Sequence, residues 1–398
     1  MAVSLLPMTK KRNIHPRSFE KTRFFPGCAG NPFDRLLHSL EIFERIPAVF
    51  VLIMLAVLAV LGSLPQIIKA GSLTWWTFAL LVFFIVDWLL IAGLPRSNRS
   101  FGPVKIIVLI LAVLRVSFAL LPAGWNLAFE MAGTLLVIYG FYLEPFNVDV
   151  HHEVFVSSKF RRNESLRVLH LSDLHMERTT RREKRILQAV REYAPDLILF
   201  SGDVLNLSYL EDETAQSDAI EFFKQLSAPL GVYGVSGSPA VDKMEFITTL
   251  ENQTGHHWLK NKVVTIDSKV GKVNLCGIVC SQNPDQDEKL LSEALSGLKQ
   301  AEGFNLLLYH SPDLAPNASR NGIDLQLSGH THGGQVRLPV IGALYTGSLY
   351  GKRFEAGRYL VNGMTLYTSR GLGMEGAIAP RVRLLCRPEI ILWEFFGQ

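Results

Sequence analysis

Apolar residues follow two different patterns along the chain. In the first 145 residues they form long, nearly uninterrupted runs, and each has about the 20 residues that a helix needs to cross a bilayer. From about residue 150 the apolar runs become short and alternate with amphipathic stretches. We therefore predict a transmembrane region over 47–145 and an α/β domain over 150–398. The four predicted spans are 47–68, 73–94, 103–122 and 125–143.

The second region reads as alternating strands and helices, which favours a layered α/β fold. The late strands suggest a second sheet packed on the first. Predicted helices cover 180–192, 214–226 and 287–300. Predicted strands cover 167–171, 197–200, 231–235, 262–266, 273–279, 304–309, 324–327, 335–338, 357–361, 364–368 and 389–395.

Composition and charge placement agree with a membrane protein. The chain has 398 residues, 48% of them hydrophobic, a mean hydropathy of +0.21 and a net charge of +4. Residues 1–46 carry eight Lys or Arg, which predicts a basic cytoplasmic tail near anionic lipid headgroups. No aromatic-interleaved basic pattern indicates nucleic-acid binding. The distribution of Lys and Arg between the spans places both chain ends in the cytoplasm, so we expect a multi-pass protein of the cell membrane.

Three ionisable residues, Asp87, Arg115 and Glu130, fall inside the predicted spans. Such residues are candidates for function. Arg115 and Glu130 flank a short turn at similar depth, which favours a buried ion pair between neighbouring helices. An ion or lipid site is the alternative.

The four cysteines show no disulfide spacing. They are Cys28, Cys276, Cys280 and Cys386. Cys276 and Cys280 lie in or next to an apolar strand-like run, so we interpret them as buried, reduced thiols rather than metal ligands.

Carboxylates and imidazoles follow several predicted strands at the point where each strand ends. Asp173 and His175 follow the first strand, Asp203 follows the second, and His310 follows a later one. His330 and His332 follow the strand 324–327; alone, this pair has the simpler reading of exposed loop histidines. Because ligands bind beyond the carboxyl ends of such strands, we expect these side chains to converge. Their mixture suits Mn, Fe, Zn or Ni.

At this level of detail the chain resembles the calcineurin-like metallophosphoesterase superfamily, in its membrane-anchored bacterial branch. The resemblance covers about 165–396 and rests on the segments Leu169–His175, Gly329–Pro339 and Thr368–Gly373. It implies an α/β/β/α sandwich of two mixed sheets that hydrolyses phosphomonoesters or phosphodiesters through two divalent metal ions and a metal-bound hydroxide.

The resemblance also assigns metal ligands. One ion would be held by Asp173, His175, Asp203 and His332. The second would be held by Asp203, His310 and His330, with Asp203 bridging the two ions.

The sequence departs from the family in the loop after the third strand. The family has Gly-Asn-His followed by an acid; this chain has Gly237-Ser238-Pro239-Ala240. Ser238 would replace the Asn as a weak or lost ligand. Pro239 stands where the usual proton-donating His would be, and it has neither a titratable group nor a backbone N–H. General acid catalysis is worth about 10²–10⁴-fold, so we expect impaired hydrolysis and name no certain catalytic residue.

Several neighbouring residues have two readings. Ser172 and Thr331 would orient the ligands, or are ordinary turn hydroxyls. His256 and His257 would form a surface turn, or supply a substitute proton donor. Arg370 would contact an anionic substrate, or stabilise its tight turn.

Two functions follow from these residues. The first is a membrane-anchored, metal-dependent phosphoesterase acting on a phosphoester, with a lipid-linked substrate suggested by the membrane location. The second is a catalytically weak or inactive metal-binding or phosphate-sensing module coupled to the membrane. The retained ligands favour the first, and the loop at Ser238 and Pro239 favours the second.

Overall fold

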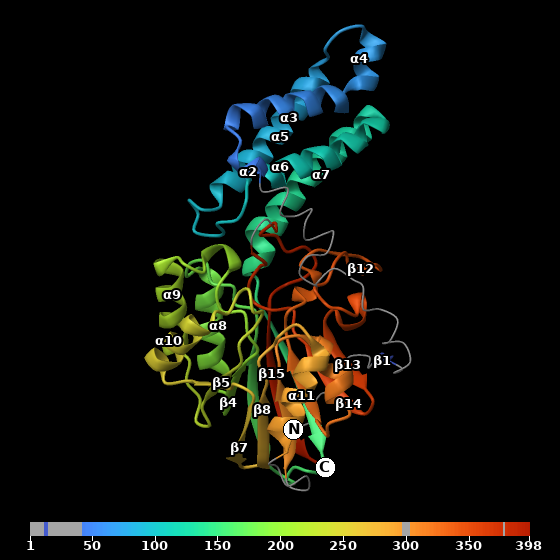
Figure 1. Ribbon diagram of the computed structural model, residues 1–398. Coiled ribbons are helices and arrows are strands. Elements are labelled where there is room, and N and C mark those ends of the chain that lie inside the picture. The colour runs from blue at the N-terminus through green and yellow to red at the C-terminus, as the bar shows by residue number, and fades with distance from the viewer. Residues whose placement is uncertain (1–11, 15–41, 297–302, 377–378) are drawn as a thin grey trace.

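The computed structural model describes residues 12–14, 42–296, 303–376 and 379–398 (Figure 1). A bundle of apolar helices lies at one end of the molecule and an α/β domain forms the rest. Most of the basic tail, including Cys28, lies outside the described residues. Cys276, Cys280 and Cys386 are buried and unpaired, as predicted.

The bundle is apolar on its outer as well as its inner face. On α3, Val51, Leu55 and Ala59 are buried at helical spacing, whereas the exposed face carries Phe50 and Ile53. A helix that is apolar all round belongs in a protein core or a membrane. The helices are α2 (Ile42–Arg45), α3 (Ala48–Gly62), α4 (Leu64–Ala70), α5 (Trp75–Gly93), α6 (Lys105–Val116) and α7 (Ala123–Ile138).

The predicted number of membrane spans is matched in part. Among the described residues, Trp75–Gly93 and Gly124–Phe146 are long and apolar enough to cross a membrane. The pair α3 and α4, bent by 62°, would make a third span if it counts as one. Helix α6 has 12 residues and continues into a short 3-10 turn, Ser117–Leu120, so it is shorter than the about 20 residues that a span needs. The fourth span stays a prediction.

The predicted ion pair between Arg115 and Glu130 is present, and it has a third member. Arg115 Nη1 lies 3.1 Å from Glu130 Oε2, and Arg115 Nη2 lies 2.7 Å from Asp87 Oδ2. The hydroxyl of Thr134 accepts from Arg115 Nη2 and donates to Asp87 Oδ1. The cluster therefore ties α5, α6 and α7 together inside the bundle.

The α/β domain is built on two mixed sheets. The six-stranded sheet has the order β2-β15-β3-β4-β5-β6, and the seven-stranded sheet has the order β1-β13-β14-β10-β9-β8-β7. The first contains β2 (Asp149–Ser157), β15 (Glu389–Gly397), β3 (Ser165–Leu171), β4 (Leu197–Phe200), β5 (Val232–Gly234) and β6 (His257–Trp258). The second contains β1 (Arg12–Ile14), β13 (Gly357–Val361), β14 (Met364–Thr368), β10 (Leu325–Ser328), β9 (Phe304–Leu308), β8 (Gly271–Gly277) and β7 (Lys262–Ser268).

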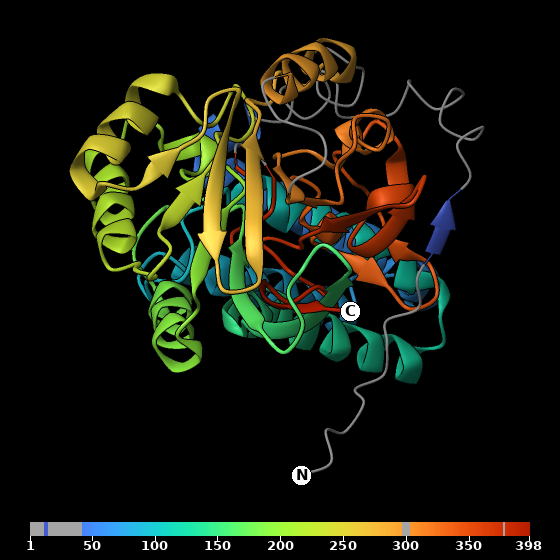
Figure 2. The ribbon, with the colours of Figure 1, turned by 90° about the horizontal axis from the view of Figure 1, so that it is seen from below.

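Alternation along the strands explains the layers. On β3, Leu166 and Val168 belong to the core between the two sheets, and Leu169 and Leu171 belong to the core under the helices. Strands β4 and β10 are buried at every residue, as expected of strands covered on both faces. The helices lie on the two outer surfaces (Figure 2). They are α8 (Arg181–Tyr193), α9 (Glu213–Lys224), α10 (Met244–Thr254), α11 (Pro284–Leu295) and α12 (Ala315–Ala318).

The predicted elements are found with small shifts of their ends, and the two-sheet prediction is confirmed. The helix predicted at 287–300 is α11, Pro284–Leu295; the end of the predicted range lies outside the described residues. Strand β2 and helix α10 were not predicted. Helix α8 begins with a capping box, in which Thr180 accepts from the backbone N–H of Arg182 and Glu183 accepts from the N–H of Thr180, a common signature of a helix start.

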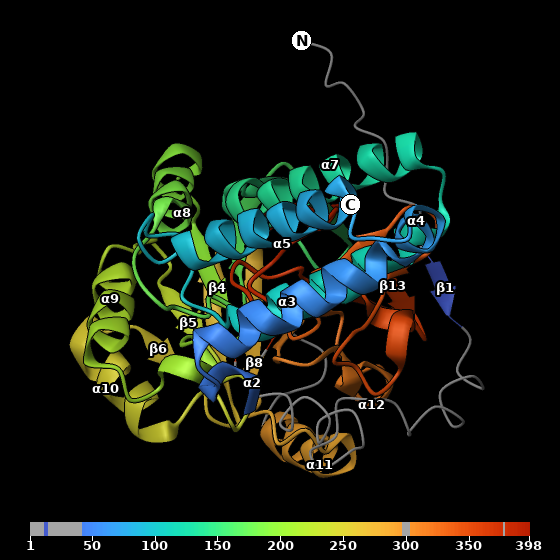
Figure 3. The same ribbon diagram turned by 90° about the horizontal axis from the view of Figure 1, so that it is seen from above.

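The helical bundle joins the α/β domain at one end. Viewed from that end, α3, α5 and α7 cross over the domain (Figure 3). The backbone N–H of Arg383 donates to the carbonyl of Gly140 (3.0 Å), and the Tyr209 hydroxyl donates to the carbonyl of Phe101 (2.8 Å). These bonds attach the turn after α7 and the loop between α5 and α6 to the α/β domain.

Candidate metal centre

The predicted ligand side chains come from loops at the carboxyl ends of strands in both sheets. Asp173 and His175 follow β3, and Asp203 follows β4. His310 follows β9, while His330 and His332 follow β10. Because the two sheets are packed face to face with these ends together, the loops meet at one edge of the sandwich.

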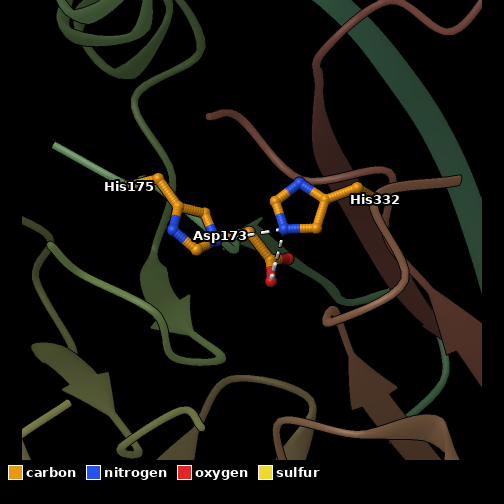
Figure 4. Close-up of side chains that lie close together, drawn as sticks. All are labelled: Asp173, His175 and His332. Atoms are coloured by element: carbon orange, nitrogen blue, oxygen red, sulfur yellow. Dashed lines mark hydrogen bonds and ion pairs between the residues drawn. The ribbon is translucent and has the colours of Figure 1, made fainter. Parts of the chain in front are cut away.

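The structure brings all six side chains together in two groups. Asp173, His175 and His332 form one group (Figure 4). Asp203, His310 and His330 form the other. Within each group, one ligand atom per residue lies within 4.8 Å of the others. Five of the six residues are almost fully buried, and His330 is half-buried.

Asp203 lies between the two groups. Its Oδ2 is 3.5 Å from His175 Nε2 and 3.3 Å from His310 Nε2. One carboxylate oxygen thus faces an imidazole of each group. This is the position that a bridging ligand would occupy.

Ser238 lies against the second group. Its backbone N–H donates to Asp203 Oδ1 (2.7 Å), and its Oγ is 3.1 Å from His310 Nε2. Pro239 and Ala240 are exposed to solvent. The loop therefore presents a hydroxyl to the centre at Ser238, and Pro239 offers it no titratable group.

The backbone is strained at the ligand positions. Five of the six residues have φ between 43° and 69°: Asp173, His175, Asp203, His330 and His332. Non-glycine residues rarely adopt this left-handed region, and such strain concentrates at functional sites. It is maintained by bonds between the loops, since Asp173 N donates to Gly202 O (2.9 Å) and His175 N to Asp203 O (3.1 Å).

Two glycines allow the loops to approach so closely. A Cβ at Gly329 would collide with Ser172 Oγ and Asp173 Oδ2, and a Cβ at Gly237 would collide with the Asp203 carboxylate. A side chain at either position would displace a predicted ligand.

Burial controls the charge of the centre. It raises the pKa of Asp173 to about 7, with the Asp203 carboxylate adding to the shift, and it raises the pKa of Asp203 to about 6. It also lowers the pKa of His175, His330 and His332. The buried carboxylates therefore lie beside neutral imidazoles, and no nearby positive charge fully balances them when they are ionised.

This donor set fits divalent cations. His310 Nδ1 lies 2.9 Å from the carbonyl of Ser201, so Nδ1 carries the proton and the lone pair of Nε2 is left for a ligand at the centre. Such an outer hydrogen bond is typical of metal-binding histidines. In the first group, Nε2 of His175 and Nε2 of His332 face each other at 3.0 Å, and both Nδ1 atoms are buried without a protein partner.

The hydroxyls of Ser172 and Thr331, for which the sequence left two interpretations open, differ in their contacts. Ser172 Oγ donates to Asp173 Oδ2 (2.5 Å) and accepts from Ser201 Oγ (2.7 Å), which in turn lies 2.9 Å from His170 Nε2. Ser172 thus supports a predicted ligand. Thr331 Oγ1 instead donates to the carbonyl of Glu355 (2.8 Å), as an ordinary turn hydroxyl does.

The other candidates lie in structural contacts. Arg370 Nε donates to Glu389 Oε2 (2.7 Å), and its Nη2 is 3.3 Å from Asp149 Oδ2, which favours the turn-stabilising reading. His256 Nε2 donates to the carbonyl of Phe223 (2.7 Å), and His257 is exposed. The contact of His256 and the exposure of His257 favour the surface-turn reading.

Two acidic residues of the centre were missed by the sequence analysis. Asp242 is buried and accepts from the backbone N–H groups of Asp203, Val204 and Gly237 (2.9, 2.9 and 2.7 Å). The signal was its position two residues after Ala240, as the next carboxylate in the altered loop. Glu375 is half-exposed, with Oε2 3.8 Å from His332 Nε2, and nothing in its sequence context marks it.

Comparison with known proteins identifies the family. Residues 166–334 match the family model described as calcineurin-like phosphoesterase. The uncharacterized metallophosphoesterase YkuE of Bacillus subtilis is 30% identical over 269 residues, which cover 64% of this chain and 88% of YkuE. The chain belongs to the calcineurin-like phosphoesterase family.

Two further relatives are informative. The phosphodiesterase YaeI of Escherichia coli is 28% identical over 280 residues, covering 66% of this chain and 95% of YaeI. The UDP-2,3-diacylglucosamine pyrophosphatase LpxG of Chlamydia trachomatis is 24% identical over 293 residues, covering 59% of this chain and 84% of LpxG. The calcineurin-like segment of this chain contains all six predicted ligands.

Proposed function

We propose that this chain is a membrane-anchored, metal-dependent phosphoesterase whose α/β domain faces the cytoplasm. The observation that carries the proposal is the convergence of Asp173, His175, Asp203, His310, His330 and His332 into two adjoining groups in a calcineurin-like phosphoesterase. The chain hydrolyses a phosphomonoester or phosphodiester at this centre.

Each group would hold one divalent ion, drawn from Mn, Fe, Zn or Ni. Asp173, His175 and His332 would hold the first ion, His310 and His330 would hold the second, and Asp203 would contribute to both. When bound, two such ions polarise a phosphoryl oxygen and lower the pKa of a water molecule. Ser238 would be a weaker ligand than an asparagine oxygen, so a second ion would bind less tightly than the first.

The protein's own side chains set the geometry. Ser172 fixes the Asp173 carboxylate, the carbonyl of Ser201 fixes the proton of His310, and Asp242 holds the loops of Asp203 and Gly237. The exposed Pro239 leaves the leaving group without a proton donor at that position. The reaction is accordingly slow, or restricted to esters with a good leaving group.

The substrate class follows from the position of the centre. The loops that carry the ligands lie at the end of the α/β domain that joins the helical bundle. A phosphoester linked to a lipid would present its phosphate at that height. LpxG, a relative of this chain, is named for a diacylated pyrophosphate substrate, which agrees with this class.

A second candidate function is a phosphate-sensing module that binds metal without turnover. The observation that favours it is the exchange of three consecutive side chains at Ser238, Pro239 and Ala240, with the ligands retained.

Hydrolysis by the full chain in lipid nanodiscs distinguishes the two functions. Bis-p-nitrophenyl phosphate and p-nitrophenyl phosphate are offered with Mn²⁺ to the natural chain, to Asp203→Ala, and to the matched exposed control Asp267→Ala. We expect turnover that requires metal, is lost in Asp203→Ala and persists in Asp267→Ala.

The repaired loop, Ser238→Asn with Pro239→His, completes the design. If a proton donor is the missing element, turnover rises by up to about 10²–10⁴-fold. Bound metal with no turnover in either the natural or the repaired chain would refute the enzyme and favour the sensing module. Failure to bind metal would refute both functions.

A further inference from the structure

A short hairpin beside the metal centre exposes apolar side chains at its tip. It consists of β11 (Arg337–Leu338) and β12 (Gly342–Ala343), joined by residues 339–341. Val340 at the tip is fully exposed, and Ile341, Leu344 and the neighbouring Leu385 are each more than half exposed. Single exposed apolar residues are ordinary, whereas a contiguous group of them marks an interaction surface.

The backbone of the tip is also strained. Val340 has φ of 68°, a region in which a β-branched residue is a clear outlier. A glycine or asparagine would relieve the strain and remove the exposed apolar side chain. The turn therefore holds an apolar residue outward against its conformational preference, which folding stability does not explain.

The hairpin is tied to the end of a membrane-crossing helix. Arg337 N donates to the carbonyl of Leu384, and Leu384 N donates to the carbonyl of Gln335, both at 2.9 Å. The next backbone N–H, that of Leu385, donates to the side chain of Glu144 (2.9 Å). Glu144 lies at the end of the apolar helix Gly124–Phe146. Two short links thus connect the hairpin to the point where that helix leaves the membrane.

The figures agree with these contacts. Figure 1 places β12 at the end of the α/β domain that carries the helical bundle. The opposite end of the domain holds the chain terminus, where Gln398 N donates to the carbonyl of Ser157.

We propose that the tip of this hairpin, Pro339–Ile341, enters the surface of the bilayer that the helical bundle crosses. The occupant of the apolar patch is the lipid interface, because the patch is continuous with the end of a membrane-crossing helix. This inference rests on the membrane anchoring in the proposed function, but not on catalysis.

The charges around the tip suit a lipid surface. The exposed Lys352 donates through Nζ to the carbonyl of Ile341, so a cation lies directly behind the apolar tip. A hollow of about 380 Å³ is lined by the hairpin together with Lys352, Glu355 and Leu385. The Glu355 carboxylate is paired with Arg337 of the hairpin (3.0 Å). Apolar side chains backed by basic ones are typical of interfacial membrane contacts, and anionic headgroups attract the cations.

The hairpin would bring the metal centre to the lipid surface. It begins two residues after Gln335, in the loop that carries His330 and His332, and Arg337 Nη1 donates to the carbonyl of Gly333 (3.0 Å). Insertion of the tip would therefore fix the ligand loop at headgroup height. A lipid-linked phosphoester would reach the centre without leaving the bilayer.

The test measures insertion directly in the full chain. Val340→Cys and the control Val156→Cys are made in a Cys28→Ser background, because the other three cysteines are buried. Each is labelled with an environment-sensitive nitrobenzoxadiazole fluorophore. Val156 is a matched control: an exposed valine near the far end of β2. The probes are nanodiscs of phosphatidylcholine and phosphatidylglycerol, each with one copy of the chain, with or without nitroxide-labelled lipid.

We expect several-fold quenching at position 340 and none at position 156. Equal and weak quenching at both positions would overturn the proposal. The proposal would also be overturned if the fluorescence change at position 340 required two copies of the chain in one disc, or a soluble protein added from outside. Either result would mean that the patch binds protein rather than lipid.

A second variant tests whether insertion of the hairpin tip matters for hydrolysis at the metal centre. The double change Val340→Glu with Ile341→Glu alters only exposed residues, so folding should be retained. We expect hydrolysis of a bilayer-embedded phosphoester to fall several-fold, and hydrolysis of bis-p-nitrophenyl phosphate to be unchanged. If quenching is seen and neither substrate is hydrolysed, the hairpin inference stands and the proposed function fails.

Discussion

Strained backbone is the feature that unites the ligand residues. Five of them occupy the left-handed region, each at the first or second turn beyond a buried strand. Hydrogen bonds between the loops of Asp173 and Asp203 hold this geometry. The Asp242 carboxylate also stabilises it, by accepting from the backbone N–H groups of Asp203 and Gly237. The predicted metal ligands are therefore held in place by their neighbours rather than by their own conformational preferences.

Asp242 gives a direct test of that support. Replacement by Asn removes one acceptor oxygen from three backbone N–H donors. Leaving a buried donor unpaired costs about 1–3 kcal/mol, so Asp242→Asn should lower the free energy of unfolding by that amount and reduce bound metal. Chemical denaturation and metal counting measure both. The exposed control Asp267→Asn should stay within about 0.5 kcal/mol of the natural chain; equal effects of the two changes would contradict the role of Asp242.

The buried carboxyls predict how metal binding depends on pH. In the metal-free chain the pKa of Asp173 is raised to about 7, so this carboxyl holds a proton at pH 6, and the metal must displace it. The pKa of His175 and of His332 is lowered, so these imidazoles hold none. Affinity should therefore rise as the pH increases from 6 through about 7 and level off at about 8, because deprotonated ligands bind metal.

Calorimetry of Mn²⁺ binding in buffers of different ionisation enthalpy measures the protons released. We expect more protons to be released at pH 6 than at pH 8. Affinity that weakens as the pH rises would contradict the burial argument.

The sequence predicts the candidate ligand residues better than the residues that hold them in place. The six predicted ligands are recognisable because their segments follow strands and match a known pattern. Asp242 contacts Asp203, which lies 39 positions away in the sequence. Glu375 lies close to His332, which is 43 positions away. Such partners depend on the packing of loops, which local sequence does not encode.

Among the elements, strands are predicted well wherever both faces are covered. Uninterrupted apolar runs such as Leu197–Phe200 are unmistakable. Strand β2 was missed because its sequence, Asp149–Ser157, mixes two histidines and two acidic residues with valines at the edge of the sheet. Helix α10 was missed because its middle is rich in β-branched residues, Ile247, Thr248 and Thr249, which favour strands.

The apolar helices show what the hydropathy of one segment leaves out. The run 103–122 is apolar apart from a few residues, Lys105 and Arg115 among them, and α6 ends at Val116, next to Arg115 and its two carboxylate partners. Hydropathy along one segment does not report such contacts with other helices.

The cluster around Arg115 predicts a coupled effect on stability. Arg115→Leu leaves Asp87 and Glu130 buried without their cation, and breaking a buried ion pair costs about 3–5 kcal/mol. Adding Asp87→Asn and Glu130→Gln should recover most of that loss, because the uncompensated charges are gone. Unfolding in mixed detergent micelles, followed by circular dichroism, measures each variant. A triple variant no more stable than Arg115→Leu would show that charge compensation is not the role of the cluster.

At the scale of the whole molecule, the bundle and the α/β domain share one segment. Residues 381–386 contact the bundle through Gly140 and Glu144. The same segment contacts the centre, since Arg383 Nε donates to the carbonyl of Gly373 and Cys386 Sγ to that of His332. The sequence predicts two regions in succession, but not that the end of the second returns to the first.

The charge distribution predicts how the molecule lies in the membrane. Both chain ends should be cytoplasmic, because Lys and Arg are enriched on that side. A green fluorescent protein fused after Gln398 should fluoresce in bacterial cells, and a periplasmic alkaline phosphatase fused there should be inactive. Fusions at the loop between α3 and α5 serve for comparison. An active phosphatase after Gln398 would reverse the orientation.

The most direct test of the account is to locate the metal itself. Crystals of the full chain grown with Mn²⁺ would be measured on both sides of the manganese absorption edge. The account predicts two anomalous peaks about 3.5–4 Å apart, one beside Asp173, His175 and His332 and the other beside His310 and His330, with Asp203 between them. No peak at these residues, or a peak elsewhere in the chain, would contradict the assignment of this cluster as a metal centre.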